Sequence, residues 1–492
     1  MGTAYRLSKS RFTAGLQCHK QLWWRVHEPD APELVPGPQT QALFDQGTDV
    51  GTLARSYVPG GTLIDLPYGR FQEKLDATAA AVAAGVRVLY EASFSADRVF
   101  VAVDILERLR GGFGLIEVKS STSAKPEHLP DAAIQAHVLE RAGLEVRSVE
   151  IMHLNRECAF PDLSDLFARA DVTNEVAALL PEVPAQVREQ LRMLEGPLPE
   201  VAIGPRCSTP RECPFVSRCW ADLPEHHVST LYRIGKQAWD LVAGGCRTIQ
   251  ALPAGVSLNA TAERQRRSVV ANELIVEPSL RDALKVFEPP LAFLDFETIN
   301  PAVPVWRGCH PYDSIPVQFS CHRQQPGGGY EHLEWLAEGP DDPRPRIAEA
   351  LVAACAGART IVAYNAGFEK TCLRALGAAL GPEAARAMEG IDSRVADLLP
   401  AVRDHVYHPD FGGSFSLKSV LPVLVPELSY TGLEVSDGGG AALELARLLL
   451  RGGTLAEAEQ ARLRDALLRY CALDTWGTAR LLERLRELAG GR

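Results

Sequence analysis

The stretch LAFLDFETIN, residues 291–300, sets two acidic residues at the end of an apolar run. The apolar residues before them predict a buried central strand. Because side chains alternate between the two faces of a strand, Asp295 and Glu297 point to the same side. Such a pair of acids belongs either to an ordinary surface edge of the sheet or to a metal site. Two later stretches of the sequence help to decide between these alternatives.

The two later stretches are VAYNAGFEKTCL (362–373) and RYCALDTW (469–476). The first predicts a strand that turns into a helix bearing Glu369. In the second, Tyr470 and Asp474 are four positions apart on a helix and therefore share one face. Four acids from three segments can converge on two metal ions, which position an attacking water and stabilise the leaving oxygen of a phosphodiester. Tyr470 would orient that water or help to deprotonate it.

This ordered set of motifs resembles the tyrosine-bearing branch of the DEDD (DnaQ-like) exonuclease superfamily, over about residues 288–490. The resemblance implies an RNase H-like α/β domain with 3′–5′ exonuclease activity that depends on Mg²⁺ or Mn²⁺. It implies a site made of Asp295, Glu297, Glu369, Asp474 and Tyr470. The second motif of the family normally ends in aspartate, so Glu369 is a departure to which the ligand geometry must adjust. Lesser candidates are Asn365, Asp397 and, for contact with a substrate phosphate, Lys418.

A second acidic pattern, GLIEVKSS (114–121), lies in the other half of the chain. Glu117 and Lys119 share a strand face, and a hairpin through the preceding glycine turn would bring Asp104 beside them. Two carboxylates suit Mg²⁺ or Mn²⁺, and the lysine could orient a water or stabilise the transition state. Taken alone, the Glu-x-Lys pattern is a weak signal and favours a surface salt-bridge ladder over a metal site. The following helix adds Gln135.

Together these residues resemble the PD-(D/E)XK nuclease superfamily, specifically its RecB-type and CRISPR-adaptation members, over about residues 5–220. The resemblance implies a restriction-endonuclease-like αβββαβ core. It implies Asp104 and Glu117 as metal ligands, Lys119 as the catalytic lysine and Gln135 as the start of the next motif, with Glu91 as an additional acid. Two departures are Gly51, where the family commonly has a histidine, and Leu139, where it has a tyrosine.

Four of the eleven cysteines form a pattern of their own. Three are evenly spaced in CSTPRECPFVSRC (207–219), and one lies far upstream; the set is Cys18, Cys207, Cys213 and Cys219. Four thiolates can hold an iron–sulfur cluster or zinc, although structural zinc usually takes one closer pair of cysteines. Buried structural cysteines are the alternative. The resembling nucleases carry a 4Fe–4S cluster on this layout, so the resemblance implies that cofactor.

The length of 492 residues predicts more than one domain. We expect a nuclease module at 1–220, a mostly helical connector at 221–288 and the exonuclease-like domain at 289–492, closed by a long helix at about 455–489. A net charge of −11 argues against a protein that coats nucleic acid through bulk positive charge, but not against a nuclease. No apolar run has the length of a membrane span, and we expect a cytoplasmic protein without membrane partners.

These observations predict a protein with two nuclease sites that cleaves nucleic acid, DNA rather than RNA, in DNA repair or anti-phage defence. The chain resembles a bacterial fusion family of otherwise undefined role that joins the two modules. The alternative is a nucleic-acid-binding scaffold in which the N-terminal site is degenerate and only the C-terminal exonuclease is active. In one form of this alternative, the substrate of the exonuclease is RNA. Gly51 and Leu139 favour this alternative. The sequence does not define protein partners.

Overall fold

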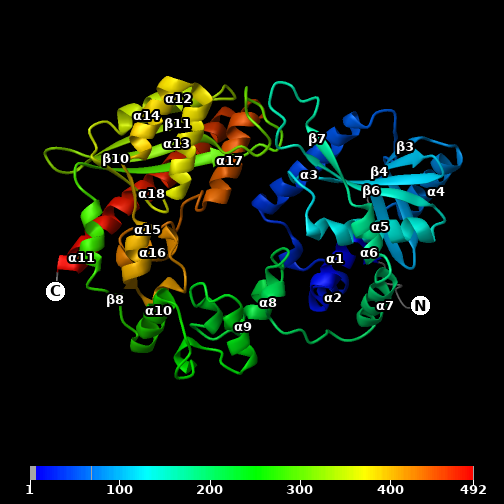
Figure 1. The fold of residues 1–492 in the computed structure, drawn as a ribbon, viewed down its shortest axis with the longest axis horizontal. Helices are drawn as coiled ribbons and strands as arrows, with labels where there is room; N and C mark the ends of the chain where they lie inside the picture. The colour runs from blue at the N-terminus through cyan, green and yellow to red at the C-terminus, as the bar shows by residue number, and fades with distance from the viewer. Residues whose placement is uncertain (1–6, 68, 491–492) are drawn as a thin grey trace. The chain divides into compact units, whose positions relative to one another are not determined.

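The computed structural model describes residues 7–67 and 69–490, and the contacts within it divide the chain into two units. Unit 1 comprises Met1–Asp222 together with Ala302–Tyr312, and unit 2 comprises Leu223–Pro301 together with Asp313–Arg492. Both units combine helices with a mixed sheet, so the expected α/β class is confirmed (Figure 1). The segment at 223–288 groups with unit 2.

Unit 1 is built on one sheet in the order β2-β3-β4-β5-β6-β7, with β1 paired to β4. The strands are β1 (Leu7–Ser8), β2 (Thr62–Leu63), β3 (Val88–Ala96), β4 (Val99–Leu109), β5 (Gly112–Lys119), β6 (Val146–Leu154) and β7 (Phe167–Asp171). The helices are α1 (Lys9–Gln17), α2 (His19–His27), α3 (Pro38–Tyr57), α4 (Phe71–Ala83), α5 (Leu129–Arg141), α6 (Thr173–Leu179), α7 (Val183–Leu194) and α8 (Val216–Trp220). The central run therefore reads α4-β3-β4-β5-α5-β6.

The hairpin between β4 and β5 brings the acidic residues of unit 1 together. Gly111 has a φ of 81°, which glycine adopts without the steric cost that other residues meet, and the turn pairs Leu109 with Gly112. Since the strands are antiparallel from this turn, Ile105 lies opposite Ile116. Asp104 and Glu117 are the next residues along each strand. Helix α5 then returns the chain to β6, which runs parallel to β5 as a helical crossover allows.

Unit 2 contains a five-stranded sheet in the order β11-β10-β9-β12-β13. Its strands are β9 (Leu291–Ile299), β10 (Ile315–Gln324), β11 (Tyr330–Leu336), β12 (Thr360–Ala363) and β13 (Val395–Asp397), and β8 (Ile275–Val276) pairs with β14 (Val406–Tyr407) separately. Strand β9 lies in the centre, antiparallel to β10 and parallel to β12. This is why its apolar residues are buried on both faces, as the sequence predicts.

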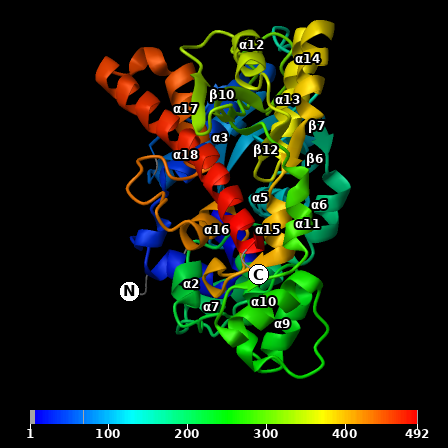
Figure 2. The same cartoon turned by 90° about the vertical axis from the view of Figure 1, so that its left-hand side faces the viewer.

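Helices cover both faces of this sheet. The even-numbered residues of β9, such as Leu294 and Phe296, pack into a core with α12 (Arg344–Ala354), α13 (Gly367–Leu380) and α14 (Pro382–Asp392). The odd-numbered residues face α18 (Glu457–Gly490), the long red helix that crosses the sheet in Figure 2. The remaining helices are α9 (Lys236–Ala243), α10 (Ala260–Ala271), α11 (Leu280–Ala283), α15 (Leu399–His405), α16 (Leu417–Leu424) and α17 (Gly438–Leu450).

The chain returns to unit 1 for eleven residues between β9 and β10. The backbone of Phe160 pairs with this segment at Gly308 and Cys309. The hydroxyl of Tyr312 donates a hydrogen bond to the carbonyl of Ser120. Ala302–Tyr312 is thus a structural part of unit 1, although the sequence separates it from the rest of that unit. Within the described ranges, no helix has the length and apolar character that a membrane crossing requires.

Candidate metal centres

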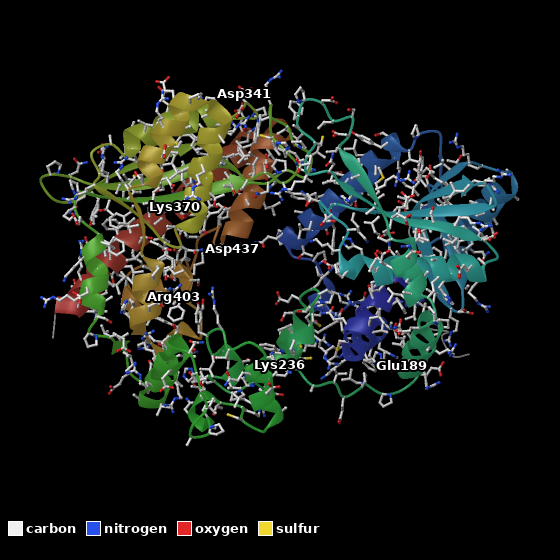
Figure 3. All side chains as sticks on the ribbon, in the orientation of Figure 1. Glu189, Lys236, Asp341, Lys370, Arg403 and Asp437 are labelled. Atoms are coloured by element: carbon white, nitrogen blue, oxygen red, sulfur yellow. The ribbon has the colours of Figure 1, made fainter. Side chains whose placement is uncertain are left out.

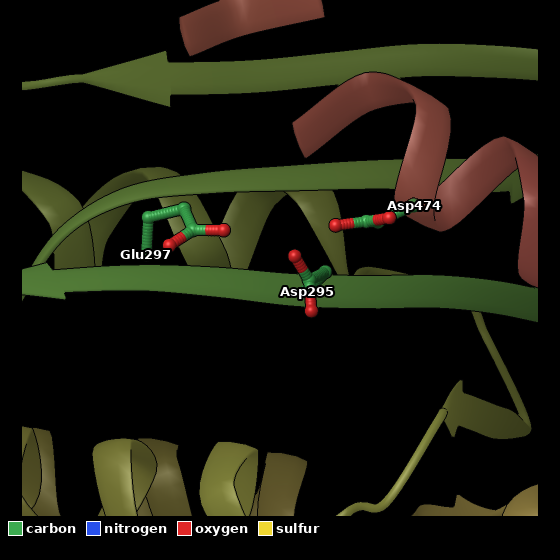
Figure 4. A group of neighbouring side chains, drawn as sticks. All are labelled: Asp295, Glu297 and Asp474. Carbon is green, nitrogen blue, oxygen red and sulfur yellow. The ribbon is translucent and has the colours of Figure 1, made fainter. Parts of the chain in front are cut away.

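Three of the predicted acids of unit 2 form a compact group. Asp295 and Glu297 project from the same face of β9, and Asp474 reaches them from α18 (Figure 4). Each side chain offers one ligand oxygen, and these oxygens all lie within 4.8 Å of one another. Oxygen ligands at this spacing suit a hard divalent cation such as Mg²⁺ or Mn²⁺.

Glu369 lies close to this group without belonging to it. It stands in the first turn of α13, which starts where β12 ends, and Asn365 with a φ of 66° makes the turn between them. Its side chain is buried, and its Oε2 has no hydrogen-bond partner. A buried carboxylate oxygen without a partner is costly, and a bound cation would satisfy it. Asp397 has a different role, because it accepts hydrogen bonds from the backbone of Asn365 and Leu399.

The acids of this centre lie close together in a buried site, and their pKa values are raised. Burial, followed by the charges of Asp474 and Glu297, raises the pKa of Asp295 well above its ordinary value. Burial and the charge of Asp474 raise the pKa of Glu297 to about 8. Burial raises the pKa of Glu369 to about 8 and that of Asp474 to about 6. Carboxylates so close together cannot all ionise without a cation, so the group favours metal binding. Asp437, labelled in Figure 3, caps α17 and adds a further negative charge near Glu297.

Two tyrosines and one lysine complete the centre. The hydroxyl of Tyr430 donates a hydrogen bond to Oδ1 of Asp474. The ammonium of Lys418 lies 4.9 Å from the ring centroid of Tyr470 and 5.5 Å from that of Tyr430. Burial and the charge of Asp474 raise the pKa of Tyr470 above its ordinary value, so its hydroxyl stays protonated at neutral pH. Tyr430 has no sequence signal, because it lies in a loop without periodicity between α16 and α17.

The predicted residues of unit 1 also come together. The backbone N–H of Val118 donates to Oδ2 of Asp104 at 2.7 Å. Glu117 accepts from Lys119 at 2.7 Å on Oε1 and from Gln135 at 2.8 Å on Oε2. Glu117 is only 1 % exposed, so it depends on hydrogen-bond donors of the protein for stabilisation. Glu91 stands slightly apart, in an ion pair with Arg55 at 2.9 Å.

Two further charged residues of this centre had no sequence signal that assigned them to it. Lys9, at the start of α1, donates to Oε1 of Glu117 at 2.7 Å. Asp131, in the first turn of α5, accepts from Lys119 at 2.5 Å. Lys9 is 108 positions from Glu117, and its basic stretch of sequence has no spacing that links it to the acids.

The charge balance of unit 1 differs from that of unit 2. Burial by itself would raise the pKa of Glu117, but the charges and hydrogen bonds of Lys9 and Lys119 hold that pKa below its usual range. Burial, followed by the charge of Glu117, raises the pKa of Asp104 to about 7. Of the two residues that depart from the pattern of the resembling nucleases, Leu139 is buried in the apolar core on α5, and Gly51 lies on α3 with open space beside its Cα.

The four predicted cysteines line one cavity. Cys18 lies between α1 and α2, and the other three lie at and before α8; the set is Cys18, Cys207, Cys213 and Cys219. Trp24 and Phe215 form apolar parts of the wall. In the described part of the chain, no cysteine forms a disulfide bond. Burial raises the pKa of Cys213, and the nearby Cys18 and Cys207 add to this effect.

A family model described as a domain of unknown function (DUF2779) matches residues 292–416. The matched segment includes Asp295, Glu297 and Glu369 and ends before Tyr470 and Asp474. No curated protein matches the chain.

Proposed function

We propose that this chain is a metal-dependent nuclease that cleaves phosphodiester bonds, in DNA rather than RNA, with one site in each unit. The observation that carries the proposal is the group of Asp295, Glu297 and Asp474, whose ligand oxygens lie within 4.8 Å of one another. The buried, unpartnered oxygen of Glu369 supports it independently. Raised carboxylate pKa values beside a strand end are typical of sites that bind cations or perform acid–base chemistry.

In unit 2 we propose a 3′–5′ exonuclease. Asp295, Glu297, Glu369 and Asp474 would hold Mg²⁺ or Mn²⁺, which when bound neutralises phosphate charge and lowers the pKa of a coordinated water. Tyr470 stays protonated and can orient a water by hydrogen bonding, which favours this role over deprotonation. The order of the sheet, with acidic β9 in its centre and α18 crossing it, supports an RNase H-like domain.

In unit 1 we propose a second nuclease site of the PD-(D/E)XK type. The run α4-β3-β4-β5-α5-β6 supports the expected core, and the hydrogen bonds of Glu117 join Lys119 and Gln135 to one centre. Asp104 and Glu117 would hold Mg²⁺ or Mn²⁺, while Lys9 and Lys119 keep Glu117 ionised. The proposed setting is DNA repair or anti-phage defence, by analogy with the fusion family that both sets of motifs resemble.

The cysteines are proposed to hold a 4Fe–4S cluster. A single zinc ion needs its four sulfurs about 4 Å apart, given Zn–S bonds of about 2.3 Å. Among the described residues, the only group of three or more ligands that meets a 4.8 Å limit is the acidic one in unit 2. Four thiols spread around a cavity are better suited to a larger cluster than to a single ion. Iron and sulfide analysis of anaerobically purified protein tests this, and zinc without iron would contradict it.

A second candidate function is a nucleic-acid-binding scaffold in which only unit 2 cleaves. The internal neutralisation of Glu117 by Lys9 and Lys119 favours it, since this centre has less need of a cation. Gly51 and Leu139, which depart from the pattern of the resembling nucleases, also favour the scaffold.

One experiment distinguishes the two. The wild type, Asp104→Ala and Asp295→Ala are compared on single- and double-stranded DNA and RNA with Mg²⁺ or Mn²⁺. Loss of separate activities in the two variants supports two sites. Loss in Asp295→Ala alone supports the scaffold, and unchanged cleavage in both would refute the nuclease proposal.

A further inference from the structure

A surface cavity lies between α18 and the hairpin of β10 and β11 in unit 2. Its volume is about 570 Å³, within the range of roughly 300–1,000 Å³ that is typical of pockets for small organic groups. Four of its wall residues carry rings and one carries a positive charge. These residues are His322, Tyr330, His332, Trp476 and, as the cation, Arg469.

The periodicity of each element places these side chains on the wall of one cavity. Tyr330 and His332 are two positions apart on β11 and therefore share a face of the sheet. His322 lies opposite His332 in the pairing of β10 with β11. Arg469 and Trp476 are seven positions apart on α18, which is about two helical turns, so they share one side of that helix.

The rings lie close to one another and remain in part accessible to solvent. The imidazoles of His322 and His332 are stacked, with their centroids 4.4 Å apart and an angle of 14° between their planes. The ring of Trp476 lies 5.4 Å from that of His322 and 5.6 Å from that of Tyr330. Three of these residues are half-buried and His332 is exposed. A cluster of accessible rings in a cavity is typical of a binding site for a planar group.

Hydrogen bonds hold the two imidazoles in fixed positions. Nδ1 of His322 lies 2.9 Å from the hydroxyl of Thr475, and Nε2 of His332 lies 2.9 Å from that of Ser320. The two hydroxyls are 2.7 Å apart, and both residues are buried. Burial, followed by the charge of His332, lowers the pKa of His322 to about 4, so its ring is uncharged at neutral pH. Walls that are fixed in advance lose little conformational entropy when a ligand binds.

The same elements carry the acidic group of unit 2. Ser320 lies opposite Asp295 in the pairing of β10 with β9, and Thr475 directly follows Asp474 on α18. Trp476 is two positions from Asp474, which corresponds to a rotation of about 200° around the helix. The cavity and the acidic group therefore lie on different sides of α18. A ligand of the cavity does not compete for the carboxylates, but it can belong to the same strand as the bond that is cleaved.

We propose that this cavity binds a nucleobase of the single-stranded substrate, stacked against Trp476. The inference rests on the proposed nuclease function and adds a base-binding contact to unit 2. Every nucleobase has a π face, so stacking on an aromatic side chain holds a strand without regard to its sequence. Because the cavity and Asp474 lie on different sides of α18, this base belongs to a nucleotide other than the one being removed.

The charge at the edge of the cavity favours a nucleic acid over an apolar peptide. The side chain of Arg469 is 70 % exposed and pairs with the exposed Asp465 at 3.0 Å. A surface pair of this kind contributes little stability, so the guanidinium can exchange its partner for a phosphate next to the bound base.

The test measures binding by fluorescence anisotropy with the full-length Asp104→Ala/Asp295→Ala protein, which leaves the probe uncleaved. The probes are labelled single-stranded DNA and RNA of about ten nucleotides. Trp476→Ala is expected to weaken binding about ten-fold, and Trp476→Phe, which keeps an aromatic ring, should restore most of the affinity. The slope of log affinity against log salt should stay the same, because stacking releases no counterions. Trp239→Ala on α9, outside the cavity, is the matched control.

Abasic probes distinguish a contact with a base from a contact with the backbone. Each probe lacks one base, at successive positions from the 3′ end, and keeps its phosphates. With the parent protein, one position is expected to weaken binding about ten-fold when its base is missing. With Trp476→Ala, the same probe should bind as well as the complete strand.

The outcomes separate this inference from the proposed function. If the parent binds neither probe and the Asp104→Ala protein does not cleave, the proposed exonuclease fails and the inference fails with it. If the parent binds but Trp476→Ala binds equally well, only the inference is overturned. Weaker binding of Trp476→Ala without any sensitive abasic position also overturns it, because Trp476 would then act through packing. Thermal unfolding shows that each variant is folded.

Discussion

In unit 1 the buried carboxylate of Glu117 accepts hydrogen bonds from two lysines and a glutamine. In unit 2, by contrast, Lys418 lies against two tyrosine rings, and no ion pair joins it to a described acid. The pKa of Glu117 is held below its usual range, whereas that of Glu297 is raised to about 8. Both centres use acids at strand ends together with lysine, yet their charge balance is opposite.

This difference has a physical consequence for metal binding. A carboxylate that already has cationic partners gains less from a divalent ion than one that lies beside other carboxylates. The unit 2 centre is therefore expected to depend strongly on metal both for folding stability and for chemistry. The unit 1 centre keeps its shape through its own lysines, and four substitutions or conditions test the contrast.

The largest effect is expected for Asp474→Asn in unit 2. The substitution keeps the shape of the side chain but removes one ligand charge, and Mn²⁺-dependent cleavage in the Asp104→Ala background should fall roughly a thousand-fold. Asp465→Asn on the same helix is the matched control, because Asp465 is exposed and pairs with Arg469. Release of nucleotides from a 3′-labelled strand measures both, and equal activities would contradict the assignment of Asp474 as a ligand.

The second-largest effect is expected for the dependence of folding stability on pH in the absence of metal. The folded pKa values of Glu297 and Glu369, about 8, lie above the ordinary value of 4.5. The folded protein thus binds more protons than the unfolded chain between these values, and stability present below pH 4.5 is lost as the pH rises toward 8. In EDTA we expect a loss of about 3 kcal/mol between pH 5 and 8, or roughly 5–10 °C in the Tm of unit 2.

Two variants and one addition test that prediction by calorimetry. Glu297→Gln should flatten the decline, and Glu334→Gln, an exposed change on β11, should leave it intact. Adding Mn²⁺ at pH 8 should raise the Tm of the wild type. If the Tm in EDTA stays constant or rises with pH, the carboxylates of unit 2 do not repel one another in the absence of metal, and the prediction is wrong.

A smaller effect is expected for Lys9→Met in unit 1. Glu117 would lose one of its charged donors while remaining buried, which should lower the free energy of unfolding by about 2 kcal/mol. Lys418→Met in unit 2 should cost no more than about 1 kcal/mol, since it removes contacts with two aromatic rings and a charge that forms no ion pair with a described acid. Urea unfolding followed by tryptophan fluorescence measures both variants. If Lys418→Met were the more destabilising, the contrast between the two centres would be wrong.

The smallest effect is expected for Tyr430→Phe. It removes one hydroxyl that donates to Asp474 and should lower kcat about five-fold, which corresponds to about 1 kcal/mol. Tyr407→Phe removes a buried hydroxyl elsewhere in unit 2 and should leave kcat unchanged. Steady-state cleavage in the Asp104→Ala background measures both, and equal rates would assign Tyr430 a packing role only.

The sequence predicts those parts of the centres that depend on local periodicity. Alternation along a strand places Asp295 beside Glu297, and the helical repeat places Tyr470 beside Asp474. The sequence also predicts the hairpin that brings Asp104 toward Glu117, because its glycine turn is a local signal.

Other partners depend on how distant segments pack, which one sequence does not encode in a readable pattern. Lys9 reaches Glu117 only because β1 pairs with β4 and sets the start of α1 against the sheet. Tyr430 reaches Asp474 from a loop whose path follows from the packing of α16 against α18. The first segment of unit 1 ends at Asp222, and no periodicity indicates that Ala302–Tyr312 joins the same unit.

The segment Ala302–Tyr312 affects how the protein can be divided into stable fragments. Its residue Ala302 packs in a small apolar cluster with Val50 and Leu154, so a fragment ending at Asp222 would leave part of that cluster exposed to water. Because the chain leaves unit 1, returns and leaves again, a single proteolytic cut cannot free either unit as an intact piece. Expression of unit 1 alone would require the eleven residues to be supplied by a linker or by a second peptide.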